Sequence, residues 1–296
     1  MNGVLNVFKE RGMTSRNVVD KIRRIYGIKK VGHGGTLDPE VAGVLPILIN
    51  RATKIADYLH LEDKEYISEL TLGEKRDTDD FTGQTEFVKE VPEIDEGLVR
   101  EVINSFLGKS MQVPPIYSAK RLNGKRLYEY ARKGQEVEIE PAEIEIYEVE
   151  IMKVDIQGHK ILFRVKCSKG TYIRSLCRDI AERLGTSGYM SYLIRTESAG
   201  LRIEDAISIE RLSQLSEGDR YKILIPMDLA LTSLKSIDLG KDKHFNLING
   251  QYVKLDKKSD FKEDVLKVYA GEFIGIGKIS ENNGNYYIKI IKRLEI

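Results

Sequence analysis

The chain has 296 residues, of which 41% are hydrophobic and 31% are charged. This hydrophobic share and the nearly balanced charge, a net +1 at pH 7, exclude an intrinsically disordered protein and show no global basic excess. Its two cysteines, Cys167 and Cys177, are too few for a disulfide framework, and the longest apolar run, residues 41–49, is too short to span a bilayer. We therefore expect a soluble, cytosolic, globular protein with no membrane partner.

Apolar periodicity and capping residues predict four elements in the first 110 residues. They are a helix that starts at Thr14-Ser15 and stops at Gly27, a helix over 51–61, a strand over 66–72, and a helix from Asp95 to just before Gly108.

Strands dominate from residue 143. The apolar residues occupy even positions in 143–146 and odd positions at Val149 and Ile151, so the change of phase at Tyr147 predicts a bulge. A turn at 157–159, a strand and a helix over 173–184 follow. Because helices and strands are mixed without a regular βαβ period, the pattern favours an α+β fold.

A compact, strand-rich tail is predicted from about Ser233 onward. Residues 272–279 and 286–291 have the pattern of two strands, and Asn282-Asn283-Gly284-Asn285 between them is a strong turn signal. These features predict a small C-terminal β domain.

Segment 108–135 has a local net charge of +6, with Tyr117, Tyr128 and Tyr130 among its basic residues. Basic groups neutralise phosphates and tyrosine rings stack on unpaired bases, so this composition suits RNA. A solvated basic loop has the same composition, and composition alone leaves both interpretations open.

Three acidic residues, Asp77, Asp79 and Asp80, carry the oxygen ligands that hard cations prefer. The glycine and the distal glutamate of a calcium loop are missing. We therefore favour a polar, capped turn and predict no metal site.

A run of glycines surrounds one acidic residue in Gly32-His33-Gly34-Gly35-Thr36-Leu37-Asp38-Pro39. Glycines permit tight turns, and Pro39 restricts Asp38 to extended geometry. The pattern is typical of a nucleophile or general base on a stiff loop, and equally of a capping Asp in a Gly/Pro turn.

Several ordered motifs, over roughly residues 1–230, resemble the TruB family of tRNA pseudouridine synthases. The Asp38 segment, continued by Gly43-Val44-Leu45-Pro46 and Ala52-Thr53-Lys54, is similar to its catalytic motif. The other matching segments are Lys64-Glu65-Tyr66, the run from Lys169 to Leu176, Pro114 to Ala119 and Gly124 to Arg132. The tail more weakly resembles the PUA-like domain of bacterial members.

The resemblance implies a catalytic domain over 1–232, with a mixed, largely antiparallel sheet flanked by helices and an RNA-binding insertion at about 108–142. It implies a PUA-like RNA-binding domain over 233–296. The reaction would isomerise uridine 55 in the T loop of tRNA to pseudouridine. Because nothing is oxidised, reduced or hydrolysed, no cofactor is demanded. The expected partner is the T stem-loop of tRNA, without a guide RNA, and the expected state is a monomer.

Residue roles also follow from the resemblance. Asp38 would be the catalytic carboxylate, and Arg174 would pair with it. Tyr66 would stack on the flipped base. The remaining substrate-binding positions are His33, Tyr172 and Leu193. The sequence does not decide whether Asp38 attacks the ribose or the base.

Some positions depart from the family pattern. Lys9-Glu10-Arg11-Gly12 lacks the usual proline after the lysine, which weakens Lys9 as a support for the site. Gly188-Tyr189 stands where an Ala-His pair is common, and Ile194 replaces an arginine, which removes one expected RNA contact. None of these departures falls on Asp38, Tyr66 or Arg174, the central residues of the expected site. They therefore concern RNA binding more than the reaction.

Three alternatives remain at this stage. The chain could be a tRNA-binding or folding helper whose catalysis is secondary, or a guide-RNA-dependent relative. A carboxylate hydrolase of the glycosidase kind would need a second positioned acid, and nothing marks the neighbouring Glu40 for that role.

Overall fold

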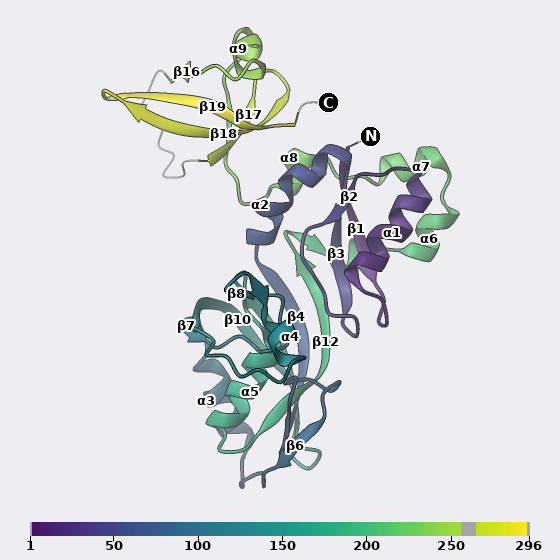
Figure 1. Cartoon of the computed structure of the whole chain (residues 1–296), viewed down its shortest axis with the longest axis vertical. Helices are drawn as coiled ribbons and strands as arrows, with labels where there is room; N and C mark the ends of the chain where they lie inside the picture. Colours follow the sequence, from purple (N-terminus) through teal and green to yellow (C-terminus); the bar gives the residue numbers. More distant parts are fainter. Residues whose placement is uncertain (1, 256–264, 295–296) are drawn as a thin grey trace. The chain divides into compact units, whose positions relative to one another are not determined.

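The structure is a computed structural model that describes residues 2–255 and 265–294 (Figure 1). Residues 256–264, within the predicted C-terminal domain, lie outside the described residues. The chain divides into two compact units: unit 1 comprises residues 1–40, 44–62 and 198–296, and unit 2 comprises residues 41–43 and 63–197. None of the helices in the described part is long and apolar enough to cross a membrane.

In unit 1, strand β1 lies between β14, which is parallel to it, and β3. Strand β2 is antiparallel to β3, with His33 opposite Ile47. The elements of this part are β1 (Gly3–Lys9), α1 (Ser15–Tyr26), β2 (Val31–His33), β3 (Ala42–Ile49), a 3-10 turn η1 (Asn50–Ile55), α2 (Ala56–Leu61), β13 (Leu201–Arg202), η2 (Ile203–Asp205), β14 (Ile207–Ser208), α6 (Ile209–Gln214), α7 (Glu217–Lys222) and α8 (Met227–Ala230).

Helix α1 confirms the prediction at both ends. Thr14 is the N-cap, with its side chain accepting a hydrogen bond from the Asn17 backbone, and Gly27 ends the helix in the left-handed region at φ 64°. Val18 and Ile22 are fully buried on one face. Local pattern was sufficient here because both capping residues act within their own turn.

The predicted helix over 51–61 is wrong in its first half. Residues Asn50–Ile55 form a 3-10 turn, and only Ala56–Leu61 are α-helical. Ile49 supplies no side-chain cap, and Asn50 has a left-handed backbone with φ 53°. The buried Ala52 and Ile55 are three residues apart, a spacing that matches the three residues per turn of the 3-10 form.

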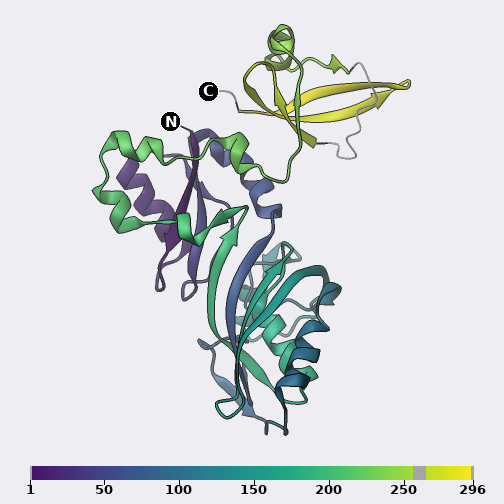
Figure 2. The same ribbon diagram turned by 180° about the vertical axis from the view of Figure 1, so that it is seen from behind.

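Unit 2 is built on a sheet whose strands follow the order β12-β4-β11-β10-β7. Both views of the chain show α3 and α5 side by side against it (Figures 1 and 2). The elements of unit 2 are β4 (Lys64–Leu72), β5 (Glu74–Arg76), β6 (Thr85–Val88), α3 (Glu96–Asn104), β7 (Gly108–Gln112), β8 (Arg121–Leu122), β9 (Lys125–Arg126), α4 (Leu127–Ala131), β10 (Ala142–Asp155), β11 (Lys160–Cys167), α5 (Ile173–Arg183) and β12 (Gly188–Ser198).

The predicted bulge lies in β10. Its pairing with β11 shifts register between Ile146 and Glu148, which places Tyr147 at the irregularity. Helices α3 and α5 also occur as predicted, with Asp95 capping the Leu98 backbone at 2.7 Å and Gly185 following α5 at φ 83°.

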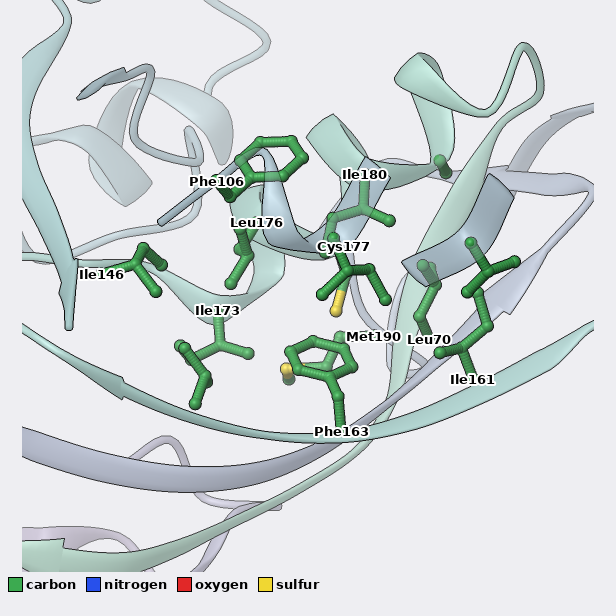
Figure 3. Close-up of a cluster of buried hydrophobic side chains, with 14 of the residues drawn as sticks. Leu70, Phe106, Ile146, Ile161, Phe163, Ile173, Leu176, Cys177, Ile180 and Met190 are labelled. Carbon is green, nitrogen blue, oxygen red and sulfur yellow. The ribbon is translucent and has the colours of Figure 1, made fainter. Parts of the chain in front are cut away.

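The core of unit 2 lies between α5 and the sheet. Leu176, Cys177 and Ile180 of α5 face Phe163 and Ile161 of β11 (Figure 3). All five side chains are at most 2% exposed. This packing fixes α5, and with it any side chain that the first turn of α5 presents.

The C-terminal part of unit 1 is a five-stranded sheet in the order β15-β17-β18-β19-β16. The predicted hairpin is present: β18 ends at Asn282, β19 begins at Asn285, and both Asn283 and Gly284 have positive φ, as a tight hairpin turn requires. Its elements are β15 (Ser236–Asp238), η3 (Lys241–Lys243), α9 (His244–Ile248), β16 (Val253–Lys254), β17 (Val265–Tyr269), β18 (Phe273–Asn282) and β19 (Asn285–Arg293). The α+β prediction with a small C-terminal β domain is confirmed.

Candidate active site

The loop over residues 34–41, here the Asp38 loop, is fixed on both sides of the acid. Ser15 donates its hydroxyl to the Leu37 carbonyl at 3.2 Å and accepts from the Leu37 amide at 3.0 Å. On the other side, the Pro39 carbonyl accepts from the Gly12 amide at 2.9 Å. Asp38 itself is exposed. The loop therefore presents a carboxylate at the surface of unit 1 on a backbone held by its neighbours.

Lys9 is a second support for this loop. Its side chain is fully buried, and the ammonium donates to the carbonyls of Met13 at 2.7 Å, Glu10 at 3.0 Å and Pro39 at 3.0 Å. The expectation that the missing proline weakens Lys9 is therefore wrong. Three carbonyls compensate the buried charge directly, so the lysine supports the loop without a proline beside it.

His33 is the last residue of β2 and stands at the entrance to the Asp38 loop. Its ring is half-buried and lies edge-on to the His60 ring, with the centroids 6.4 Å apart. Directly after it, the Gly34 amide donates to the Pro46 carbonyl at 2.8 Å. A Cβ at Gly34 would come within 3.2 Å of the Pro46 Cβ, so the close approach of the loop to β3 favours glycine there.

In unit 2, Arg174 projects from the first turn of α5 and is 8% exposed. Its guanidinium donates to the Thr78 carbonyl at 3.3 Å and to the Tyr117 carbonyl at 3.0 Å, and lies 3.4 Å from the Asp80 carboxylate. We call Arg174, Asp80, Thr78 and Tyr117 the Arg174 cluster. Two separate segments of unit 2 thus fix the orientation of one buried cation.

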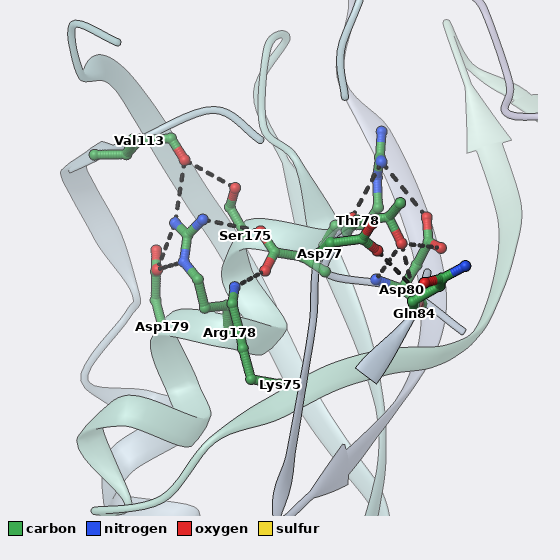
Figure 4. A network of polar contacts seen from close by, with 11 residues as sticks. Lys75, Asp77, Thr78, Asp80, Gln84, Val113, Ser175, Arg178 and Asp179 are labelled. Atoms are coloured by element: carbon green, nitrogen blue, oxygen red, sulfur yellow. Dashed lines mark hydrogen bonds and ion pairs between the residues drawn. The ribbon is translucent and has the colours of Figure 1, made fainter. Parts of the chain in front are cut away.

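The acidic run forms the polar, capped turn that the sequence favoured (Figure 4). Asp80 accepts from the Thr78 hydroxyl at 2.8 Å and from the Thr82 amide at 2.9 Å. Asp77 accepts from the Gln84 amide at 2.9 Å, and Asp79 pairs with Arg178 at 3.0 Å. The three carboxylates are therefore engaged in different interactions within the protein.

Tyr66 lies on β4 with its side chain in the core of unit 2, where Leu193 of β12 packs against the same cluster. The two strands are neighbours, and Thr196 of β12 donates to Glu65 of β4 at 2.8 Å. Arg195, 1% exposed, hydrogen-bonds the Tyr66 side chain. Burial lowers the pKa of the Arg195 guanidinium, and the contact with Tyr66 acts in the opposite direction. A buried cation therefore holds the phenol of Tyr66.

Comparison with known proteins gives three matching family models. The TruB family pseudouridylate synthase N-terminal domain matches residues 23–173, the tRNA pseudouridylate synthase B C-terminal domain matches residues 174–232, and the pseudouridine synthase II TruB C-terminal model matches residues 236–284. The first model alone spans more than half of the chain. This chain belongs to the TruB family of pseudouridine synthases.

Curated TruB relatives match over nearly their whole length. The tRNA pseudouridine synthase B of Caldanaerobacter subterraneus subsp. tengcongensis is 46% identical over 94% of this chain and 95% of its own. That of Streptococcus pneumoniae serotype 4 is 42% identical over 97% and 98%. A solved archaeal box H/ACA sRNP Nop10-Cbf5 complex matches with a TM-score of 0.75 and 25% identity, over 99% of this chain and 85% of the matched chain. The chain is thus an isomerase of the pseudouridine synthase type.

The predicted site residues of this TruB-family chain fall into two groups. His33 and Asp38 belong to unit 1, on one strand and the loop that follows it. Tyr66, Tyr172, Arg174 and Leu193 belong to unit 2, where Tyr66 and Leu193 share one hydrophobic cluster and Tyr172 and Arg174 start one helix. The pairing of Asp38 with Arg174 stays a prediction.

The sequence patterns did not identify two residues that contact the predicted site residues, Arg195 and Asp80. Arg195 is two positions after Leu193 on the same strand, so alternation places it on the same face. An arginine at a core-facing strand position was a usable signal. Asp80 was noticed only as one acid of a turn, and no local pattern connects it with Arg174, which lies 94 positions further along the chain.

Neither cysteine has the surroundings of a nucleophile. Burial raises the pKa of both the Cys167 and the Cys177 thiols to about 12, so both stay protonated at neutral pH. Among residues 2–255 and 265–294, no three His, Cys, Asp or Glu side chains are grouped so that they could hold a metal ion.

Proposed function

We propose that this chain isomerises uridine 55 in the T loop of tRNA to pseudouridine. The observation that carries the proposal is an exposed Asp38 on a loop fixed at Leu37 and Pro39, in a chain whose curated relatives bear the name tRNA pseudouridine synthase B. Those names do not favour the alternative of a folding helper with secondary catalysis.

The reaction moves one base on its ribose. The bond between N1 and C1′ breaks, the base turns, and a bond between C5 and C1′ forms. The proton on C5 leaves and N1 gains one, so the change is an isomerisation. Asp38 supplies the carboxylate that the bond exchange needs, by attack at either the ribose or the base.

The target base must leave its stack before it can reach Asp38. Flipping costs a few kcal/mol, and stacking on an aromatic ring returns about 1–3 kcal/mol. In the proposal Tyr66 provides that ring, while His33, Tyr172 and Leu193 complete the uridine site. Arg174 pairs with Asp38, because a neighbouring guanidinium favours the ionised form of a carboxylate.

The basic segment 108–135 supports direct contact with RNA. All of its basic side chains except the half-buried Lys120 are exposed, and Arg132 lies over the Tyr128 ring at 5.3 Å. Exposed cations beside aromatic rings suit phosphate and base contacts. We therefore propose that residues 1–232 are the catalytic domain, with the insertion at about 108–142 binding the T stem-loop.

Residues 233–296 would form a second RNA-binding domain of the PUA-like kind. The chain would act in the cytoplasm as a monomer, without a guide RNA, since its own basic segment supplies RNA contacts.

Mapping of pseudouridine in tRNA treated with the purified chain tests the proposal. We expect pseudouridine at position 55, and the same product on an isolated T stem-loop with no added RNA. A product that appears only when a second RNA is supplied would contradict stand-alone action. Unmodified position 55 in every tRNA tried would contradict the proposed function itself.

A further inference from the structure

Gln112 clamps the backbone at the start of α5. It is the last residue of β7 and is 3% exposed. Its side-chain oxygen accepts from the Tyr172 amide at 2.8 Å, and its side-chain nitrogen donates to the Tyr172 carbonyl at 3.1 Å. One carboxamide therefore satisfies both backbone groups of a residue 60 positions away.

Tyr172 begins the helix without a side-chain cap of its own, and Gln112 holds its backbone from outside the helix. Tyr172 is the N-cap of α5, with extended backbone angles of φ −99° and ψ 113° and no side-chain capping bond. Its carbonyl also accepts the first intrahelical bond, from the Leu176 amide at 3.0 Å. The direction in which α5 begins thus depends on how the backbone N–H and C=O of Tyr172 are held.

The clamp has a rigid base. Gln112 pairs with Ala142 across the β7–β10 ladder, so its backbone belongs to the sheet. Side chains on such elements hold a site more accurately than side chains on loops. The carboxamide bonds both backbone groups of Tyr172, as a neighbouring strand would, and this fixes both the position and the tilt of that residue.

The residues after Gln112 extend the same contact along α5. The Val113 carbonyl accepts from the Ser175 hydroxyl at 2.8 Å and from Arg178 at 3.1 Å (Figure 4). Further on, the Tyr117 carbonyl accepts from Arg174 at 3.0 Å. The beginning of the basic segment is therefore docked on the helix turn that carries Arg174.

We propose that Gln112 is a positioning residue for the reaction: its carboxamide sets the backbone of Tyr172 and, through the first turn of α5, the guanidinium of Arg174. Gln112 acts through these two residues and does not touch the reacting base. The inference rests on the proposed function and adds a residue to its site. It predicts that loss of the clamp slows the chemical step while tRNA still binds.

Two variants remove the clamp in different ways. Gln112→Met keeps the length of the side chain and removes both hydrogen bonds. Gln112→Glu keeps the acceptor for the Tyr172 amide but places a carboxylate oxygen against the Tyr172 carbonyl. Thr186→Val is the matched control, because it removes the bonds of a buried hydroxyl to the Glu90 carbonyl at 2.9 Å and the Lys89 carbonyl at 3.3 Å, just beyond the other end of α5.

The two measurements are single-turnover kinetics with tRNA and hydrogen exchange of the backbone. We expect the single-turnover rate constant of both Gln112 variants to fall about 10- to 100-fold, the scale of a small misplacement of reacting groups, with tRNA affinity close to that of the unaltered chain. Exchange should rise at Tyr172 and in the first turn of α5. Thr186→Val should leave the rate constant unchanged.

The outcomes distinguish a failure of the positioning role of Gln112 from a failure of the proposed function. If the unaltered chain forms pseudouridine and both Gln112 variants keep its rate constant, the positioning role is overturned. The positioning role is also overturned if the Gln112 variants lose only tRNA affinity, or if the single-turnover rate constant of Thr186→Val falls as far as theirs. If the unaltered chain makes no pseudouridine, the proposed function fails, and the exchange data still show whether Gln112 holds Tyr172.

Discussion

The Asp38 loop of unit 1 and the Arg174 cluster of unit 2 differ in how far they bury their main side chains. Asp38 is exposed, and the backbone on either side of it is anchored at Leu37 and Pro39. Arg174 is buried, and its guanidinium is held directly by Asp80 and two carbonyls.

The difference has an energetic basis. An exposed carboxylate keeps its hydration, so its presence costs little in folding, and the supports described above act on the backbone beside it. A buried guanidinium loses its hydration and needs opposite charge and acceptors around it. We therefore expect changes in the Arg174 cluster to reduce stability and activity together. Changes at Asp38 itself should reduce activity alone.

The largest combined effect is expected from Asp80→Ala. It removes the Asp80 carboxylate from beside the buried Arg174 guanidinium, and breaking a buried pair of this kind costs about 3 kcal/mol. Urea unfolding measures the loss, and the single-turnover rate should fall with it. Glu143→Ala is the control, because Glu143 pairs with Lys109 on the surface and should cost about 0.5 kcal/mol or less. Equal stability losses in the two variants would contradict the expected difference between the buried and the surface ion pair.

A double-mutant cycle on Arg195→Met and Tyr66→Phe sharpens the description of unit 2. A hydrogen bond to a charged group contributes about 1.5–3 kcal/mol, and we expect a coupling energy of that size between the two positions. The measurement is the free energy of unfolding of the two single variants and the double variant. Additive losses would show that Arg195 does not hold the Tyr66 phenol.

A smaller effect is expected from Ser15→Ala, which removes both hydrogen bonds to Leu37. Stability should fall by about 1–2 kcal/mol, because one buried pair of backbone groups loses its partner. The single-turnover rate should fall about tenfold as the Asp38 loop loosens, with tRNA affinity retained. Ser213→Ala, which removes an exposed helix-surface bond to Glu210, is the control and should change neither quantity. A full rate in Ser15→Ala would show that Leu37 does not need this anchor.

The smallest effect is expected at the two cysteines, whose thiols should not react in the folded chain. Because burial raises the pKa of Cys177 to about 12, a thiol reagent near neutral pH should not label the native chain. Both cysteines lie in unit 2, so labelling reports the opening of that unit. Asp80→Ala should accelerate labelling, whereas Ser15→Ala should not. Rapid labelling of the unaltered chain would contradict the packing of α5.

Local pattern was enough for much of the fold. The caps of α1, the bulge at Tyr147 and the hairpin turn at Asn283-Gly284 all depend on residues within a few positions of one another. The helix over 51–61 was wrong because its apolar spacing is compatible with both helical forms. The first half is instead a 3-10 turn that begins at Asn50, and no spacing reveals the left-handed backbone of that residue.

The sequence motifs predicted which residues belong to the site, but not the contacts that hold those residues. Motifs named Asp38, Tyr66 and Arg174, whereas their supports come from distant parts of the chain. Gln112 and Tyr172 are 60 positions apart, and Ser15 and Leu37 are 22 apart. Such contacts arise from the tertiary fold, and a single sequence carries no periodicity that would link them.

The most direct test of the account is Asp38→Asn, assayed for pseudouridine at position 55 of tRNA and for tRNA binding. The carboxamide has the same shape as the carboxylate, and the anchors at Leu37 and Pro39 are untouched. The account predicts no detectable pseudouridine, with tRNA affinity and unfolding free energy equal to those of the unaltered chain. Substantial product from the purified variant would contradict the assignment of Asp38 as the catalytic group.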